Sequence, residues 1–445
     1  MRGARAVGVC ALVLGIAACT RVFDAVVPVG GGMVCAPQST EPGCEPTPWP
    51  TTGHTMNSDP WLVTHNQVIT VMKPNVLVLN FDNGQSGTQT MTYAKQVANV
   101  LAAGSAYHAY SNPAAPDFLE YNILPIVDLT SSPTGPSVNG NVPLTSTGDF
   151  DPSALFNNAK YNHFYGYPDA SAPGGYQSLC QLFENGTINE VWIQDGGGTQ
   201  LSDGTMLPRA PLYAERKMTY DGNGVATGTF DQCIGGGSSG TQTCLNIACT
   251  VTVRLAHLDP SPAGGPGCDV QVRGWGIEGM WAALPGDVAG DANAFLNQNF
   301  RSQFGVTFNS WSEICASSPC VDYPNPMRAR STSGDATTFD IDPFSQGCGS
   351  SLFPPNATAP DDFEDATQVN ARCEHFGLHD GSDGMDQYQP YSNAVVANYD
   401  QMYTGNSQCP AGWQVYWRQS MPGYQNQAIA GDGTPMKNWW PMLFY

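Results

Sequence analysis

Two glutamates stand among apolar and aromatic neighbours, and such surroundings give a carboxyl group acid chemistry. Glu278 lies in the segment RGWGIEGMW, close to Trp275 and Trp281, and Glu215 lies in PLYAERKM. Desolvation disfavours the charged form of a carboxyl group, so a glutamate in such a place can act as a general acid. Two carboxylates across a sugar ring are what glycoside hydrolysis requires. The structural alternative is an ion pair with the neighbouring arginine in each segment.

Three aspartates mark the ends of apolar runs. Asp82, Asp128 and Asp195 each lie at or just after the end of such a run. In open α/β sheets, ligands bind beyond the carboxyl ends of the strands, so these side chains are expected at one edge. Carboxylates that converge there could bind a hard cation or act as an acid–base pair. The alternative is ordinary turn chemistry, in which an aspartate accepts the next backbone amides.

A serine nucleophile is a competing hypothesis. Gly84-Gln85-Ser86-Gly87 falls on an expected strand-to-helix turn, but it lacks the last glycine of the G-x-S-x-G motif. The literal match, at 236–240, lies in a low-complexity segment with no apolar strand before it. We therefore expect Ser86 to be a helix N-cap, and a serine esterase is the third function considered.

A short acidic loop, DGSDGMD, is the best candidate for a cation site. Asp380, Asp383 and Asp386 recur every third residue among glycines, which allows an oxygen-lined loop, but the EF-hand spacing is missing. His375 and His379 lie four residues apart without the H-E-x-x-H order of helical zinc sites. We expect no required cofactor, with structural calcium at the three aspartates as the alternative to a solvated turn.

Tryptophans near the C-terminus and around Glu278 could stack on sugar rings. The candidate binding set is Trp275, Trp281, Trp417, Trp439 and Trp440. Large aromatic residues are more often part of the core. If these side chains are exposed, they favour a non-catalytic protein that binds a glycan or another partner, which is the main alternative to an enzyme.

Alternating strand and helix patterns must position these residues. Continuous β-branched and aliphatic runs at 75–81, 121–129 and 188–194 are typical of strands buried on both faces. Helical spacing of apolar residues predicts a helix over 88–103, and a second helix is expected at 176–185. This order predicts an α/β fold with a mostly parallel sheet and a flavodoxin-like or similar doubly wound core.

The pattern loosens after residue 196, where strand candidates remain at 249–255 and 269–274. We assign the α/β core to residues 73–284 and expect long loops stapled by disulfides. Residues 285–445 are rich in loops, aromatic residues and cysteines, and we expect them to pack on the core as an extension.

The first twenty residues, MRGARAVGVCALVLGIAACT, have the basic start and short apolar run of an export signal. The run ends in Ile16-Ala17-Ala18-Cys19, which resembles the lipobox of bacterial lipoproteins. The resemblance covers this leader alone. It implies a signal peptide at 1–18, lipid on Cys19, and attachment to a membrane of the bacterial cell envelope. Residues 19–72 are rich in Pro, Thr and Gly, and we expect them to form a tether.

Composition narrows the classes of partner. Loss of residues 1–18 would remove two arginines and leave 15 basic against 38 acidic residues, a formal charge of −23. Such a chain repels phosphate backbones and anionic lipid surfaces, so we expect no nucleic acid as partner. Contact with a membrane should come from the lipid on Cys19.

Twelve cysteines remain after Cys10 and Cys19 are set aside, an even number in an exported chain. Disulfides are the expectation in an oxidising compartment, and the CxxC pairs of zinc sites are missing. The twelve are Cys35, Cys44, Cys180, Cys233, Cys244, Cys249, Cys268, Cys315, Cys320, Cys348, Cys373 and Cys409. Cys35 and Cys44 could close a small loop.

These observations together favour an exported lipoprotein that hydrolyses an extracellular polymer, polysaccharide first. Glu278 would be the general acid and Glu215 its carboxylate partner. Asp82, Asp128 and Asp195 would be further acids at the edge of the sheet. The sequence does not decide between this enzyme and the non-catalytic binding protein.

Overall fold

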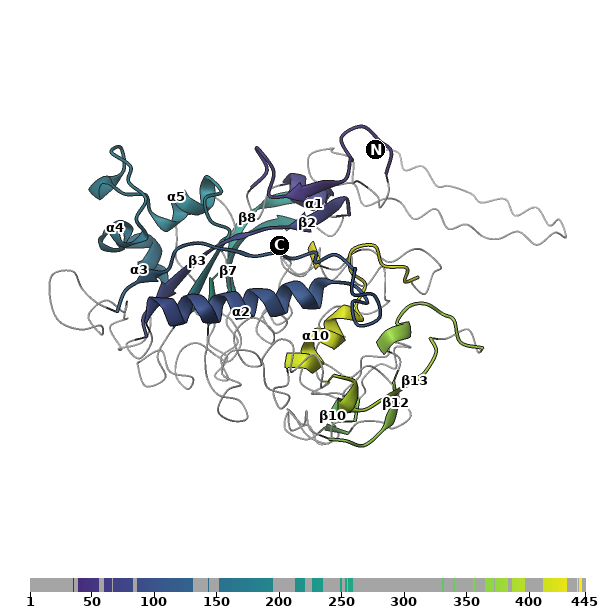
Figure 1. The fold of residues 1–445 in the computed structure, drawn as a ribbon. Helices are drawn as coiled ribbons and strands as arrows, with labels where there is room; N and C mark the ends of the chain where they lie inside the picture. Colours follow the sequence, from purple (N-terminus) through teal and green to yellow (C-terminus); the bar gives the residue numbers. More distant parts are fainter. Residues whose placement is uncertain are drawn as a thin grey trace, which may run out of the picture.

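A parallel β-sheet lies at the centre of the computed structural model, with helices on both sides (Figure 1). The structure describes residues 35, 39–55, 60–65, 67–82, 86–130, 143, 152–194, 213–220, 226–234, 249, 253, 255–258, 330–331, 339–340, 355–356, 365–371, 373–382, 386–396, 411–429, 438 and 440–441. In these ranges, no helix combines the length and the apolar character needed to cross a bilayer.

Strand β3 (Asn75–Asn80) forms the middle of the sheet, because its side chains are apolar on both faces. On one side it pairs in parallel with β6 (Glu190–Gln194), which in turn pairs with β9 (Leu255–Leu258). On the other side it pairs in parallel with β4 (Asn122–Ile123) and β5 (Val127–Asp128). The strand order is therefore β4/β5, β3, β6, β9, and the predicted α/β fold with a mostly parallel sheet is confirmed.

Alternate residues of β3 and β6 enter two separate cores. Val76, Val78 and Trp192 pack with the helices α2 (Gly87–Ser105) and α10 (Ala411–Gln419). Leu77, Leu79, Val191 and Ile193 pack on the opposite face of the sheet, in a second core with α3 (Pro152–Asn157), α4 (Asn162–Tyr165) and α5 (Leu179–Glu184). Period-two alternation in a strand that is apolar throughout thus covers both faces of the sheet.

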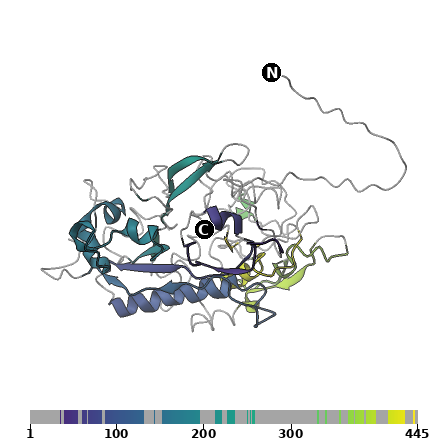
Figure 2. The same cartoon turned by 90° about the horizontal axis from the view of Figure 1, so that it is seen from above.

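Helix α2 matches the helix predicted over 88–103, with one residue more at its start and two at its end. The C-terminal helix α10 packs along its last turns. Gln419 donates from Nε2 to the carbonyl of Ala103 at 2.8 Å, and a Cβ on Gly104 would approach the Arg418 side chain to 3.0 Å. Gly104 therefore allows the close approach of two helices far apart in sequence (Figure 2).

Two predicted strands differ in detail from what forms. The run at 121–129 makes two short strands, β4 and β5, because Pro125 between them cannot donate to the sheet. Strand β9 starts at the last residue of the strand expected at 249–255, most of which lies outside the described residues, as does the candidate at 269–274.

The folded region begins earlier in the chain than the predicted start at residue 73. Strand β1 (Thr47–Trp49) pairs in parallel with β2 (Ile69–Met72), and α1 (Pro60–His65) connects them. The Trp49 and Met72 side chains are fully buried in the core that contains α2. A segment with the composition of a tether therefore supplies core residues to the body.

The remaining elements are short, apart from an antiparallel pair of strands of eight and nine residues, β7 (Tyr213–Tyr220) and β8 (Ala226–Ile234). In the first cartoon, α3–α5 lie at the opposite end of the body from the elements that follow residue 369, and the second view agrees (Figure 1; Figure 2). The full set of remaining elements is η2 (Ala159–Tyr161), η3 (Pro173–Gly175), β7 (Tyr213–Tyr220), β8 (Ala226–Ile234), β10 (Arg330–Ser331), β11 (Phe339–Asp340), β12 (Val369–Ala371), η4 (Cys373–His375), β13 (Gln389–Tyr391) and η5 (Asn393–Val395).

The expected disulfides are confirmed for the pairs Cys35–Cys44 and Cys180–Cys249. Cys373 is disulfide-bonded as well. The first pair closes a loop of the N-terminal segment. The second links α5 to Cys249, which precedes β9 in the chain. Covalent cross-links of this kind form and persist in oxidising environments.

Three asparagines link the strands at the amino-terminal edge of the sheet. Asn122 donates from Nδ2 to Asn75 Oδ1 at 2.7 Å, and Asn75 donates from Nδ2 to the carbonyl of Thr187 at 3.1 Å. Asn189 accepts the backbone N–H of Asn75 at 3.0 Å and donates to the carbonyl of Thr55 at 2.7 Å. These bonds connect neighbouring strands and fasten the N-terminal segment to them.

Candidate functional site

The carboxyl-terminal edge of the sheet brings together polar residues from its two central strands. In the register of the sheet, Asn80 at the end of β3 is paired with Gln194 at the end of β6 and with Asp128 at the end of β5. Paired residues of parallel strands point to the same side, here the side of α2. After β3 the chain moves to β4 and β5 on one side and later returns to β6 on the other, so the strand order reverses at this edge.

Three polar side chains at this edge are buried. Asn80 and Gln194 have no exposed surface, and Asp82 is 6% exposed. Asn80 Oδ1 accepts the backbone N–H of Asp82 at 3.0 Å, and the N–H of Phe81 bonds the carbonyl of Gln194 at 2.9 Å. We call Asn80, Asp82 and Gln194 the edge cluster. Burying a polar group without a hydrogen bond costs free energy, so we expect the side chains of the edge cluster to be held in defined orientations.

Asp128 reaches the same edge but is exposed there. Its Oδ1 accepts both the backbone N–H of Thr130, at 2.9 Å, and the Thr130 hydroxyl. This is the turn chemistry that the alternative interpretation of these aspartates expects. Asp195, directly after Gln194, lies outside the described residues. Of the three predicted edge acids, the structure thus places Asp82 and Asp128 together at one edge.

The two glutamates proposed for acid–base chemistry remain predictions. Glu215 lies in β7, opposite Gln232 of β8 in an antiparallel hairpin. Glu278 lies outside the described residues, as do Cys19, Trp275, Trp281 and Trp439. The structure therefore gives no separation between the two carboxyl groups.

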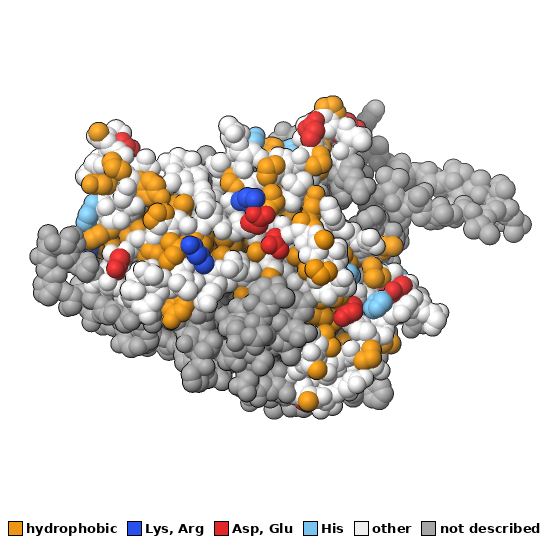
Figure 3. Space-filling model, viewed as in Figure 1, with side chains coloured by type: hydrophobic (Ala, Val, Ile, Leu, Met, Phe, Trp, Pro, Cys, Tyr) orange, Lys and Arg blue, Asp and Glu red, His pale blue; other side chains and the backbone are white. Residues whose placement is uncertain are grey.

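The described tryptophans of the binding set belong to the core. Trp417 in α10 and Trp440 are 3% and 1% exposed, and both pack in the cluster under α2. Their rings are thus enclosed by protein, as the core interpretation of these aromatics expects. On the face drawn in Figure 3, apolar and uncharged side chains cover most of the described surface, and charged side chains are few and scattered.

The aspartates of the DGSDGMD loop hold the backbone of that loop. Asp386 is 7% exposed and accepts the N–H groups of Gly377 and His379, at 2.9 and 3.0 Å. Asp380 accepts His375 Nδ1 at 2.7 Å and the N–H of Gln387 at 3.1 Å. Among described residues, no three His, Cys, Asp or Glu side chains form a group able to hold a metal ion. Asp383 lies outside them, and calcium there stays a prediction.

The two histidines of the same segment contact different partners. His375 bonds Asp380 through Nδ1, whereas His379 Nε2 lies 3.0 Å from the carbonyl of Ile429. His379 has a positive φ of 52°, so the backbone between them is not helical. The four-residue spacing therefore does not place both imidazoles on one helical face.

Ser86 serves as the N-cap of α2. Its side chain accepts the backbone N–H of Gln89 at 3.3 Å, while the Gln89 side chain accepts the Ser86 N–H at 2.9 Å. The Ser86 hydroxyl also donates to Gln89 Oε1 at 2.9 Å. This reciprocal capping box is the expected structural role. It commits the hydroxyl to the helix start rather than to a histidine.

A cluster of titratable groups beside α10 had no counterpart in the sequence analysis. Tyr416 donates its hydroxyl to Glu374 Oε1 at 2.9 Å, and the Tyr110 ring lies 5.1 Å from that of Tyr416. Burial raises the pKa of both phenols, and the charge of Glu374 raises it further. Burial and the charge of His375 lower the pKa of His108 to about 4. These residues are too distant in the chain for spacing to reveal them.

Glu190 is a buried carboxyl group that the sequence did carry a signal for. It is 1% exposed, and it accepts the Tyr121 hydroxyl at 3.1 Å and Trp192 Nε1 at 2.9 Å. An acid inside an apolar strand run, as in INEVWIQ, is the pattern that marks it. Its place at the amino-terminal part of β6, away from the edge cluster, indicates a structural role.

Comparison of the chain with known protein families, with curated proteins and with solved structures found no match.

Proposed function

We propose that this chain is an exported, lipid-anchored hydrolase of an extracellular polymer, polysaccharide first, with its site at the carboxyl-terminal edge of the sheet. The observation that carries the proposal is the edge cluster. It places a buried carboxyl group, Asp82, beside two buried amides where the strand order reverses. Ligands of open α/β sheets bind at such a reversal.

The strand order also supports the finer fold assignment. In chain order, β3 is the first strand position of this sheet, and the second position, formed by β4 and β5, pairs with one side of β3. The third and fourth positions, β6 and β9, lie on the other side of β3. A flavodoxin-like core has this order at its first four strands. We propose a flavodoxin-like or similar doubly wound core on that basis.

The proposed chemistry uses two carboxyl groups in succession. Glu278, as general acid, gives its proton to the oxygen of the leaving sugar, while a carboxylate partner, Glu215, activates water or attacks the sugar carbon. Asp82 and the other edge acids stabilise positive charge that develops on the sugar ring. A water molecule supplies the atoms that complete both products. The polymer would bind across this edge.

The exported location is supported by two features of the chain. The leader ends in a lipobox at Ile16-Ala17-Ala18-Cys19, and the described body contains disulfides that suit an oxidising compartment. Lipid on Cys19 would hold the protein on a bacterial envelope membrane. Labelling cells with a palmitate analogue tests this: the wild-type chain should carry the label in the membrane fraction, and Cys19→Ala should not. Label on the variant would contradict lipidation of Cys19.

The activity is tested on residues 20–445, which lack Cys19 and its lipid, with a panel of polysaccharides. Released reducing ends report hydrolysis, and thermal stabilisation reports binding. We expect release from at least one polymer, with a loss of at least about 100-fold in Glu278→Gln and Asp82→Asn, the scale of a general acid–base contribution. Asp169→Asn is the matched control, because Asp169 is an exposed turn acid bonded to Ser171.

Four outcomes are distinguishable. Equal loss in all variants would indicate a folding defect, which circular dichroism checks, and undiminished release in both site variants would contradict the site. Stabilisation without release would identify the non-catalytic binding protein instead. If no polymer gives either release or stabilisation, polysaccharide is excluded as the ligand.

A further inference from the structure

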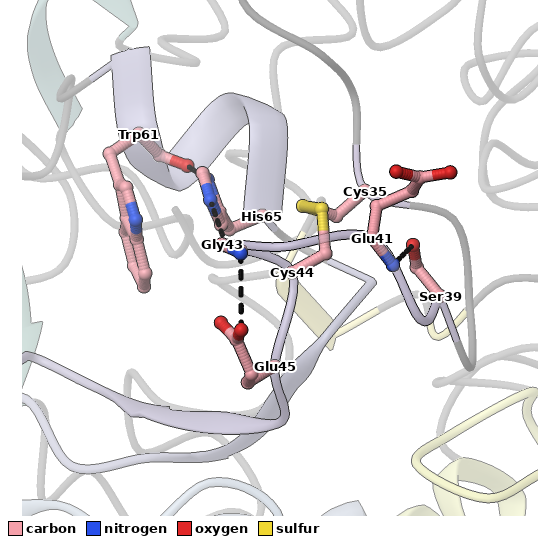
Figure 4. The surroundings of a disulfide bond; sticks show 8 residues. All are labelled: Cys35, Ser39, Glu41, Gly43, Cys44, Glu45, Trp61 and His65. Carbon is pink, nitrogen blue, oxygen red and sulfur yellow. Dashed lines mark hydrogen bonds between the residues drawn. A yellow bond between two sulfur atoms is a disulfide. The ribbon is translucent and has the colours of Figure 1, made fainter.

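The junction between the N-terminal segment and the body is built around a small disulfide loop. Cys35 and Cys44 close the loop, and both pack against Val68, with each of the three side chains at most 5% exposed. The loop turns through Gly43, whose φ of +88° is a conformation that favours glycine. Figure 4 shows His65, at the end of α1, beside this turn.

His65 lies between two backbone carbonyl groups, one on each side of its ring. Nδ1 is 2.7 Å from the carbonyl oxygen of Trp61, and Nε2 is 3.0 Å from the carbonyl oxygen of Gly43 (Figure 4). A carbonyl oxygen only accepts hydrogen bonds. A neutral imidazole has one N–H, so it satisfies one of these two oxygens, whereas the imidazolium satisfies both.

The first of these bonds belongs to the helix and the second to the loop. The carbonyl of Trp61 lies in the first turn of α1, four residues before His65. The carbonyl of Gly43 lies in the disulfide loop. His65 is therefore the side chain that connects the loop to α1, and the connection needs a proton on each ring nitrogen.

Two aromatic rings and a carboxyl group lie close to the ring or to the turn that it contacts. The imidazole stacks on Trp61 with centroids 4.4 Å apart, and His54 stacks on the same indole at 4.7 Å. Glu45 Oε1 accepts the N–H of Gly43 at 3.1 Å. Backbone N–H groups of Glu45 and Gly43 lower the pKa of that carboxyl group, and the charge of His65 lowers it further. An anion thus shares the loop that His65 contacts.

We propose that His65 is a pH-responsive latch that holds the Cys35–Cys44 loop to α1 when its ring is doubly protonated. Loss of one proton removes one of the two hydrogen bonds, and either the carbonyl of Gly43 or that of Trp61 loses its contact with the ring. Histidine is the side-chain type whose ring gains or loses its second proton between mildly acidic and neutral conditions, so the test of the latch spans that range. The described body begins at this loop on its N-terminal side, and the anchor proposed at Cys19 lies further upstream. The latch does not depend on that anchor or on the hydrolase.

The rate of disulfide reduction tests the latch in the full-length, oxidised protein. The reductant is a phosphine, and mass spectrometry follows Cys35–Cys44 and Cys180–Cys249 in the same sample. The second bond corrects for the effect of pH on the reagent. We expect the ratio of the two rates to rise about tenfold between pH 5.5 and pH 8, because a lost charge-assisted hydrogen bond of about 1.4 kcal/mol corresponds to that factor.

Two variants and one direct measurement make the result decisive. In His65→Gln the ratio should be high at both pH values, and in His54→Gln the tenfold dependence should persist, because the stacking neighbour does not reach the loop carbonyl. The ¹⁵N signals of the wild-type ring should show two protonated nitrogens at pH 5.5. A pH dependence shared by wild type and His65→Gln, or a singly protonated ring at pH 5.5, would overturn the proposal, even if a variant failed to fold.

Discussion

The two edges of the central sheet use similar polar residues for different purposes. At the amino-terminal edge, Asn122, Asn75 and Asn189 hydrogen-bond from one strand connection to the next and on to Thr55. At the carboxyl-terminal edge, Asn80 accepts the N–H of Asp82 two residues further along the same chain segment. One set of bonds spans segments distant in sequence, and the other shapes a turn that carries a carboxyl group.

The difference separates an edge that is fastened by long-range hydrogen bonds from the edge at which we propose the site. Cross-strand bonds fix the register and close the amino-terminal edge with the N-terminal segment and the turn before β6. Bonds local to a strand end orient a side chain at the carboxyl-terminal edge. The predictions below test the assignment of structure to one edge and function to the other.

Gly186→Ala should have the largest effect on stability. Gly186 has a φ of +72°, and a Cβ there would collide with the Thr55 side chain. Left-handed strain and overpacking together predict a loss of about 2–4 kcal/mol in the free energy of unfolding. Chemical denaturation measures it. In a Thr55→Gly background the same substitution should cost at least about 1 kcal/mol less, because the steric part is gone. A cost independent of Thr55 would show that this contact does not fasten the edge.

Asn189→Ala should come next, with a loss of about 1–3 kcal/mol. Asn189 is 1% exposed, and its removal leaves the N–H of Asn75 and the carbonyl of Thr55 without this partner. Denaturant titration measures the loss. The matched control is Asn112→Ala, since Asn112 is an exposed asparagine that accepts only a local N–H, from Ala114 at 3.3 Å. Equal effects of the two substitutions would remove the basis for calling this edge the structural one.

Ser86→Ala should have the smallest effect, about 1 kcal/mol from the lost N-cap. Ser86 follows the turn at the carboxyl end of β3, so it distinguishes structure from chemistry at that edge. Thermal unfolding should show the small loss, and any hydrolysis found in the polysaccharide assay should survive. A stable variant without activity would revive the serine esterase hypothesis.

Residue patterns over short stretches determined the central part of the fold. The spacing of apolar residues correctly predicted strand β3, helix α2 with its capping serine, and strand β6. This spacing can be seen within each segment, because it follows from which of its own side chains are buried. The turn aspartate Asp82 was found for the same reason. Asn80 and Gln194 went unnoticed, although a polar residue ending a buried run was the available signal.

Tertiary contacts decided the rest. The Pro-rich segment before residue 73 enters the body because Trp49 and Met72 find a core that the segment itself does not contain. Trp417 and Trp440 became core rather than surface for the same reason, and Tyr416 met Glu374 across 42 residues. Local sequence fixes the conformations that a segment favours, whereas burial and hydrogen bonding between distant segments depend on packing. The two edges of the sheet acquired their separate characters only when packing brought those segments together.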